Sequence, residues 1–353
     1  MEYSSFSQLK GLTWFQTYKD ILKWEDKKGN LPEPIGATID LTTICNLRCN
    51  HCNSQHSWEI GKTQKREDVE KQLIILKTLG CKSICFAGGG EPTLVPWFKD
   101  IIQLANEMGF EVGISSNFTT IDLKTMHAIA KYATFCGVSL DAGNPETYNK
   151  IKKAPLFNRV MDNLDKMVKI IKRNNSKLDF VVKFLINNDN QKEIYDACFK
   201  TYAAGVKTFY VRPAGFHEFN FDVYLIENQM KRCQDFAKHC REDLHQNFIV
   251  QSSFSRVNPE TYGKIHNFKV CHATPLLIQI CADGNVYQCI DKRYRLDAVL
   301  CHWTELMKYW GSAEHRQKVK EINLEACPRC AFGNYNEQIE KCVIRDDLYW
   351  KFP

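Results

Sequence analysis

Short β-rich apolar runs alternate with amphipathic stretches of helical periodicity from residue 36 onward. The β-rich runs lie at residues 36–43, 83–87, 110–115, 135–141, 178–186 and 208–212. The helical pattern between them is clearest at residues 97–108, 158–173 and 191–204. Repeated strand–helix alternation predicts a parallel sheet covered by helices. The periodicity fits an open sheet and a barrel equally well, and both place chemistry at loops leaving the carboxyl ends of the strands.

The two ends of the chain depart from this alternation. Residues 1–35 carry aromatic and aliphatic side chains at helical spacing and end near two prolines, which predicts an amphipathic lead-in helix. Residues 36–225 are expected to form the main unit, and residues 226–265 a helical connection. Cysteines then replace the alternation, so residues 266–353 are predicted to form a smaller, metal-organised domain.

Composition narrows the class of protein. No apolar stretch among the 353 residues approaches the roughly 18 needed to span a bilayer. The N-terminus lacks a secretory signal pattern, so we expect a reducing, cytoplasmic setting in which 16 cysteines indicate metal binding or catalysis. The 47 Lys and Arg exceed the 41 Asp and Glu only slightly, which suits anionic small molecules as well as nucleic acid. No long basic stretch is interleaved with aromatic residues, which argues against nucleic acid as the partner.

Three cysteines, Cys45, Cys49 and Cys52, fall within eight residues of the loop that follows the first predicted strand. A closed structural zinc site has four protein ligands, whereas a reactive metal site keeps one position open. Thiolates suit zinc and iron–sulfur clusters alike. Three cysteines on a four-iron cluster would leave one iron without a protein ligand, whereas His51 could complete a zinc site.

Small and polar residues close the next predicted strands. Gly88–Gly90 and Glu91 follow the second strand, and a glycine run there forms either a tight turn or a close backbone approach to a ligand. Polar side chains at the third and fourth strand ends could bind a ribose or a carboxylate, or could be ordinary loop and cap residues. These side chains are Ser116, Asn117, Ser139 and Asp141.

The CX3CX2C spacing of Cys45, Cys49 and Cys52, at the start of a repeated strand–helix pattern, resembles the radical S-adenosylmethionine (SAM) superfamily. The resemblance covers about residues 36–220. It implies that the three cysteines hold a [4Fe–4S] cluster whose unique iron is chelated by SAM. One electron from the cluster would cleave SAM to a 5′-deoxyadenosyl radical that abstracts hydrogen, so the cofactors carry the chemistry.

The resemblance also implies contacts to SAM at the strand ends. The family's GGE element, which binds the amino group of SAM, matches Gly89, Gly90 and Glu91. The positions that contact the ribose and methionyl part of SAM match Ser116, Asn117, Ser139 and Asp141. Relatives often carry an arginine for the SAM carboxylate just beyond, where this chain has only lysines, which cannot make the planar fork. Lys152 and Arg212, the latter at the end of the sixth strand, are the candidate carboxylate or substrate anchors.

A second group of cysteines lies near the C-terminus. Two separated thiols flank a hairpin turn, and a CX2C pair follows them. Such a set supplies four ligands, enough for a tetrahedral metal or a fully protein-ligated [4Fe–4S] cluster, and the spacing alone does not choose between zinc and iron–sulfur. The four are Cys271, Cys289, Cys327 and Cys330.

The pattern CX12GX4C followed by CX2C resembles the SPASM extension of the same superfamily and its shorter form, Twitch, over residues 266–335. A full SPASM domain continues with a cysteine where this chain has Asn336. The resemblance therefore implies a Twitch-like domain with one auxiliary [4Fe–4S] cluster. Three further cysteines could replace members of the ligand set: Cys281, Cys301 and Cys342.

Together these resemblances imply a partial, open (β/α)6 TIM-like barrel with a small C-terminal iron–sulfur domain. They imply a radical SAM oxidoreductase, a flavodoxin- or ferredoxin-like electron donor, and an auxiliary cluster that accepts the substrate radical's electron in a two-electron oxidation. Twitch-type relatives oxidise sugars or cyclitols, and SPASM-type relatives crosslink or epimerise peptides. Only 35 residues precede the first strand, too few for the N-terminal domain common in peptide enzymes, so a small polar substrate is favoured over a peptide. A zinc or iron–sulfur scaffold without catalysis is the remaining alternative.

Overall fold

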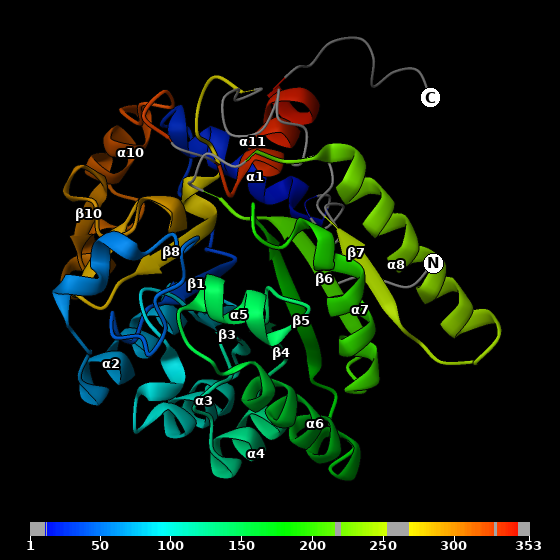
Figure 1. The fold of residues 1–353 in the computed structure, drawn as a ribbon. Coiled ribbons are helices and arrows are strands. Elements are labelled where there is room, and N and C mark those ends of the chain that lie inside the picture. Colours follow the sequence, from blue (N-terminus) through cyan, green and yellow to red (C-terminus); the bar gives the residue numbers. More distant parts are fainter. Residues whose placement is uncertain (1–10, 12, 216–219, 253–267, 328–329, 345–353) are drawn as a thin grey trace.

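The computed structural model describes residues 11, 13–215, 220–252, 268–327 and 330–344. Its strands form one ten-stranded sheet in the order β10–β9–β8–β1–β2–β3–β4–β5–β6–β7 (Figure 1). Neighbours from β8 through β1 to β7 pair in parallel, whereas β9 pairs antiparallel with both β8 and β10. The strands are β1 (Gly36–Ile39), β2 (Ser83–Phe86), β3 (Glu111–Ser116), β4 (Phe135–Ser139), β5 (Asp179–Ile186), β6 (Thr208–Pro213), β7 (Ile249–Ser252), β8 (Leu277–Ile280), β9 (Asn285–Tyr287) and β10 (Val299–His302).

Helices cover the outer side of the curved sheet, as Figure 1 shows for α2, α3, α4, α6, α7 and α8. Each follows a strand and packs an apolar face on it, as expected of βα repeats. The helices are α1 (Phe15–Glu25), α2 (Arg66–Thr78), α3 (Phe98–Glu107), α4 (Leu123–Tyr132), α5 (Pro145–Lys152), α6 (Phe157–Arg173), α7 (Ile194–Ala203), α8 (Val223–Glu242), α9 (Leu306–Tyr309), α10 (Ala313–Lys320) and α11 (Gly333–Gln338).

The six strands predicted from the sequence are β1–β6, and the predicted fold class, a partial parallel barrel, is confirmed. Two strands were not predicted, β7 and β10. β7 lies within the stretch that was expected to be a helical connection, and it extends the parallel sheet beyond β6. Only three consecutive residues there are apolar, Phe248, Ile249 and Val250, too short a run to distinguish a strand from the helix that was expected.

Alternate residues of each strand face the helices or the concave side of the sheet. In β5, Val182 and Phe184 belong to the helix-covered core, so Lys183 between them faces the concave side. The same alternation turns Ser115 of β3 and Arg212 of β6 toward the concave side, and all three are only partly buried. The inner surface of this barrel is therefore polar, unlike the packed apolar interior of a closed (β/α)8 barrel.

The first and last described segments lie side by side in the fold. β8, near the C-terminus, pairs with the free edge of β1, with Gly36 opposite Leu277. α1 is the predicted lead-in helix, and its buried Tyr18 and Ile21 share a cluster with Ile339, just beyond α11. Figure 1 accordingly shows α1 beside α11. The C-terminal segment thus continues the main sheet instead of standing apart from it.

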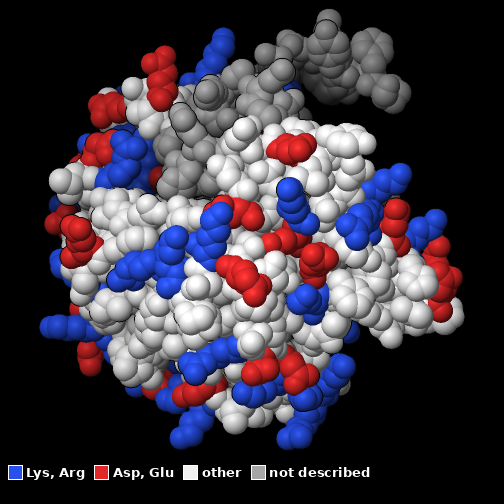
Figure 2. Space-filling view, in the orientation of Figure 1, with Lys and Arg blue, Asp and Glu red and all other residues white. Residues whose placement is uncertain are grey.

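Within the described residues, no helix is long and apolar enough to cross a membrane. Figure 2 shows Lys and Arg interspersed with Asp and Glu over the face in view, so neither sign of charge dominates that face.

Candidate active site

A cavity of about 180 Å³ opens at the carboxyl ends of the parallel strands, where this architecture places active sites. All three cysteines of the loop after β1 line it, together with Arg212 from the end of β6. The other predicted site residues in its lining are Gly90, Glu91, Ser116, Asn117, Ser139, Asp141 and Lys152. Gly89 lies next to this lining but outside it. The fold thus gathers residues from separate βα loops into one cavity.

The cysteine loop is anchored on the end of α5. The backbone N–H groups of Arg48 and Asn50 donate to the carbonyls of Lys152 and Ile151, at 3.2 and 3.0 Å. These carbonyls belong to the last turn of a helix, where no intrahelical donor remains for them. The loop therefore takes its shape from a helix about one hundred residues further along the chain.

The glycine run is pressed against the cysteine loop. A Cβ on Gly88 would lie 1.7 Å from Asp40 Oδ1, and one on Gly90 would lie 2.0 Å from the Ile44 carbonyl oxygen. Gly88 also has φ +124°, a region that favours glycine. The Gly90 N–H donates to the Thr42 carbonyl at 2.7 Å. The glycine run therefore makes a close backbone approach to the protein itself, and its predicted approach to a ligand stays a prediction.

Glu91 is fully buried, and both of its oxygens accept hydrogen bonds from the protein. Oε1 accepts from the Thr93 N–H and hydroxyl and, at 2.6 Å, from the Ser116 hydroxyl. Oε2 accepts from the Asn117 N–H at 2.7 Å. Burial raises the pKa of Glu91, while these donors pull it back down. The carboxylate thus fixes the loop after β3, whose Asn117 amide lies 3.9 Å from the Cys45 sulfur.

Asp141 and Lys152 form a buried ion pair in the cavity wall. Asp141 also accepts the Leu185 N–H at 2.7 Å and lies 3.2 Å from His51 Nε2. Burial alone would raise the pKa of Asp141, but the Lys152 charge and the His51 contact outweigh burial and hold the pKa below its ordinary value. Both oxygens of Asp141, a predicted contact of SAM, are thus engaged by protein groups, and Asp141 orients Lys152 and His51.

A second buried ion pair, between Asp40 and Arg293, was missed by the sequence analysis. The Arg293 guanidinium lies 3.3 Å from Asp40 Oδ1 and donates to Asn53 Oδ1 and Ser54 Oγ at 3.2 and 3.1 Å. Asp40 in turn accepts the Gly89 N–H at 3.0 Å. A residue that follows Cys289 therefore holds the residues that follow Cys52. The available signal was an acidic residue at the end of a barrel strand.

The donor set of this cavity fits an iron–sulfur cluster. Burial raises the pKa of the Cys45 thiol to about 12 and moves that of Cys49 in the same direction, with Lys152 partly offsetting the shift at Cys49. Thiolates at these positions therefore need a cationic partner, and a coordinated metal supplies one. With Cys52 in the same lining, three thiols are available from the protein.

The four predicted C-terminal cysteines line another, smaller cavity, of about 20 Å³. Cys271 precedes β8, Cys289 follows β9, and Cys327 and Cys330 lie before α11. Burial raises the pKa of Cys330 to about 12, and the pKa values of Cys289 and Cys327 move the same way. The same argument, thiols that need a cation to ionise, makes this donor set suitable for a second metal group.

The three alternative cysteines lie elsewhere. Cys281 is buried beside Asp40, Cys301 is in β10, and Cys342 is exposed. Asn336, at the position where the SPASM pattern has a cysteine, donates from its amide to the Cys271 sulfur at 3.7 Å. In the part of the chain that the structure describes, no three His, Cys, Asp or Glu side chains converge on a single-ion site.

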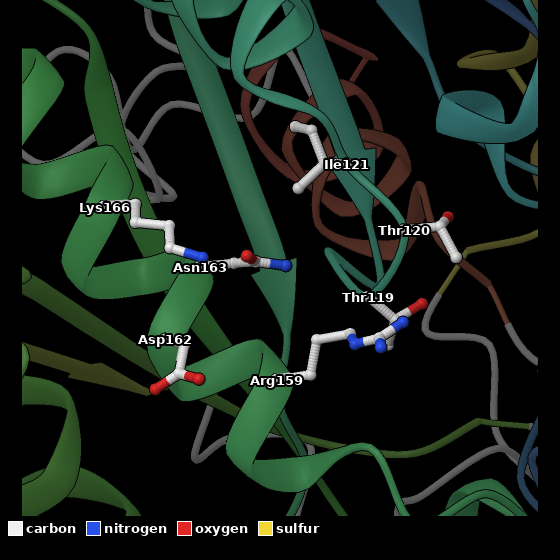
Figure 3. A pocket seen from close by; sticks show the side chains of 7 residues that line it. All are labelled: Thr119, Thr120, Ile121, Arg159, Asp162, Asn163 and Lys166. Atoms are coloured by element: carbon white, nitrogen blue, oxygen red, sulfur yellow. The ribbon is translucent and has the colours of Figure 1, made fainter.

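A larger cavity of about 330 Å³ lies apart from these cysteines, between the loop after β3 and α6. Figure 3 shows Arg159, Asp162 and Lys166 projecting from α6, with Thr119 and Thr120 opposite. The three charged side chains are exposed, and none of the predicted site residues lines this cavity. The larger volume of this cavity therefore does not make it the candidate active site. The clustering of thiols and buried charges in the smaller cavity does.

Comparisons with known proteins agree with this geometry. Residues 39–198 match the family model described as the radical SAM superfamily. The chain is 24% identical over 273 residues to a probable GTP 3′,8-cyclase of Pyrococcus abyssi (strain GE5 / Orsay), a match that covers 74% of this chain and 86% of that protein.

Two further comparisons concern peptides. The chain is 28% identical over 181 residues to the antilisterial bacteriocin subtilosin biosynthesis protein AlbA of Bacillus subtilis (strain 168), over 50% of this chain and 39% of AlbA. The fold is similar to that of Streptococcus suis SuiB bound to its precursor peptide SuiA, with a TM-score of 0.65 and 14% identity over 92% of this chain and 74% of SuiB.

Proposed function

The chain belongs to the radical SAM superfamily through its domain at residues 39–198, and from this premise we propose that it oxidises a C–H bond of a small polar substrate. One observation carries the proposal. Cys45, Cys49 and Cys52 share a single cavity with Glu91 and Lys152 at the carboxyl ends of the strands. When bound, a [4Fe–4S] cluster and SAM supply the organic radical that abstracts the hydrogen atom.

The residues of this chain would bind the cluster and SAM and orient them in the cavity. The three thiolates would hold the cluster and leave one iron for SAM. Lys152, kept charged by Asp141, presents a cation to the carboxylate of SAM. Glu91 fixes the loop that carries Ser116 and Asn117, so those two residues can face the ribose and methionyl part without rearrangement. Leu47 and Leu185 supply apolar wall that keeps water from the reacting centre.

The second set of thiols supports a net two-electron reaction. Cys271, Cys289, Cys327 and Cys330 would hold a cluster with four protein ligands, and electron transfer is the chemistry such a group supplies. The buried Asp40–Arg293 ion pair links the two thiol sites. Arg293, which follows Cys289 of the second site, also donates a hydrogen bond to Asn53, which follows Cys52 of the first. An electron donor of the flavodoxin or ferredoxin class would complete the cycle.

Peptide modification is the second candidate function. Its support is the likeness to AlbA, a subtilosin biosynthesis protein, over half of this chain. The likeness to SuiB concerns the fold, which accommodates a peptide in that protein. The likeness to a GTP 3′,8-cyclase points instead to a small, anionic substrate and covers more of the chain.

The test is anaerobic incubation of the iron-loaded chain with SAM and dithionite, followed by quantification of 5′-deoxyadenosine. We expect cleavage by the wild-type chain and none by C45A/C49A/C52A. Deuterated candidate substrates, one cyclitol and one short peptide, then decide between the two functions by which of them transfers deuterium to 5′-deoxyadenosine. A wild-type chain that holds iron at the first site and never cleaves SAM would contradict the proposal.

A further inference from the structure

A row of polar side chains crosses the concave face of the sheet beside the SAM cavity. Ser139 of β4 is in register with Lys183 of β5, Lys183 with Tyr210 of β6, and Tyr210 with Gln251 of β7. Residues in register on adjacent strands point to the same side. Because Val182 and Val211 pack toward the helices, the row faces the barrel interior.

Lys183 reaches across this interior to a strand it does not pair with. Its ammonium donates to the Ser115 hydroxyl of β3 at 2.5 Å, passing over Gly137 of the intervening strand β4. A Cβ on Gly137 would lie 2.7 Å from Lys183 Cε and 3.0 Å from Nζ. Glycine in a strand interior weakens the strand and marks a close approach. Because Gly137 has no side chain, the Lys183 side chain can pass over β4 at this point.

This lysine is not explained by packing or by an ion pair. The described carboxylates form no ion pair with it, and Asp141, which acts on it from further away, is paired with Lys152. Burial and the charge of Arg212 lower the pKa of Lys183 to about 8. A poorly solvated cation beside a second cation costs stability, which an anionic partner would recover.

Two neighbouring features place the lysine in a binding site. Ser115, its hydrogen-bond acceptor, and Arg212 both line the cysteine cavity. Gln251, at the far end of the row, has a buried side-chain oxygen without a hydrogen-bond partner among the described residues. Such an oxygen can accept a hydrogen bond from a hydroxyl or amine group of a ligand, but not from an oxyanion.

We propose that this row is the substrate subsite of the radical SAM cavity and that Lys183, with Arg212, binds a carboxylate or phosphate oxyanion of the substrate. The inference rests on the proposed function, because it takes SAM to fill the part of the cavity nearest the cysteines. It assigns to Lys183 the selection of an anionic substrate.

The experiment measures oxyanion binding to the anaerobic, iron-loaded chain by isothermal titration calorimetry. The titrants are inorganic phosphate and succinate at constant ionic strength, with SAM saturating and no reductant present. We expect saturable binding of one of them, weakened about tenfold or more in K183M, since a charged hydrogen bond is lost. K166M, a surface lysine of the larger cavity, is the matched control and should bind within about twofold of wild type.

A second variant guards against misfolding of K183M. G137A keeps the charge but fills the path of the lysine side chain, so it should weaken oxyanion binding in the same direction. Phosphate binding without succinate binding identifies a phosphorylated substrate, and the reverse a carboxylic acid. Absence of saturable binding overturns the inference, as does binding that K183M and G137A leave unchanged. A parallel titration without SAM is included, and binding that occurs only in the absence of SAM also overturns the inference, because the row would then hold SAM itself.

This outcome is separable from that of the proposed function. A chain that cleaves SAM and binds no oxyanion would refute only the substrate subsite. A chain that binds an oxyanion through Lys183 and never yields 5′-deoxyadenosine would refute the radical chemistry and leave the anion site standing.

Discussion

Glu91 illustrates how a carboxylate can line a cofactor cavity and yet act on the protein. Its two oxygens accept four hydrogen bonds from Thr93, Ser116 and Asn117. Under the proposed function, the side chain therefore acts on SAM through the loop that it holds. The E91Q variant keeps the shape of the Glu91 side chain and loses one acceptor oxygen. It therefore separates this positioning role from a direct contact of Glu91 with the cofactors.

E91Q should lower the free energy of unfolding by about 1–3 kcal/mol. The reason is that the NH2 group of glutamine would face buried groups that are themselves hydrogen-bond donors. The loosened loop should weaken SAM binding, measured by calorimetry without reductant, and leave the iron content unchanged. E107Q, on the exposed face of α3, should match wild type within about 0.5 kcal/mol. Loss of iron in E91Q would show that Glu91 instead supports the cluster directly.

Lys183 predicts an unusual pH dependence. Burial and the charge of Arg212 lower its pKa to about 8, partly offset by Cys85 and Cys136, against about 10.4 in an unfolded chain. The folded chain therefore binds this proton less tightly than the unfolded one. Its destabilising effect is full below pH 8 and declines as the pH rises toward 10.

K183M should accordingly be more stable than wild type at pH 7, by about 1–2 kcal/mol after allowance for partial solvent exposure. Urea unfolding at pH 7, 8 and 9 should show this advantage shrinking as the pH rises. K172M, on the exposed end of α6, should show no such trend. A K183M chain less stable than wild type at pH 7 would mean that the lysine is a structural group.

Among the elements, the loops after β1 and β2 behave as one unit. The Gly90 and Glu91 N–H groups donate to Thr42 and Ile44, and Gly90 leaves no room for a side chain beside the Ile44 carbonyl. The residue after Ile44 is the first cysteine of the motif. The glycine run therefore helps to position the start of the cysteine loop through backbone contacts, alongside the anchor on α5.

G90A should displace the cysteine loop and destabilise the chain by about 1–3 kcal/mol, in the range of overpacked cores. Iron bound at the first site should fall, as measured by iron and sulfide analysis after anaerobic reconstitution. G113A is the control, since its added Cβ would meet nothing closer than the Cys85 sulfur at 3.6 Å. It should load iron normally and melt at or above the wild-type temperature. Equal iron in G90A and wild type would refute this coupling.

The elements were predictable from the sequence where the period was long. β1–β6 and most of the covering helices follow from the alternation of apolar runs, because each strand and each helix buries an apolar face where the two pack together. β7 contains only the end of a run of three apolar residues, Phe248–Val250, too short to indicate a strand. The cysteine motif and the strand-end residues were found because spacing and position in a βα unit are local properties.

Other parts of the site could not be predicted because they depend on distant pairs. Nothing near Asp40 in the sequence reveals that Arg293 will form an ion pair with it. Likewise, nothing near Asp141 reveals that Lys152 will pair with it. Lys183 did leave a signal, a single charge in the run Phe-Val-Val-Lys-Phe-Leu-Ile. Its meaning required the register that sets it opposite Ser139 and across from Ser115.

At the scale of the molecule, two thiol-lined cavities share one sheet. We expect about four irons at each, as in [4Fe–4S] clusters. C45A/C49A/C52A should retain about half of the iron and lose all SAM cleavage. C327A/C330A should also retain about half, cleave SAM and form no oxidised product. C342A, the exposed alternative ligand, should keep all of the iron. Full turnover by C327A/C330A would remove the second site from the reaction.

The pairing of β1 with β8 bears on how this chain matures. β1 is synthesised well before β8, so one edge of β1 has no partner strand until β8 has been made. Arg293, which grips the residues after Cys52, emerges later still. The residues that follow Cys52 therefore gain this contact only after Arg293 has been synthesised, and we expect the first cysteine loop to be held less firmly before that point.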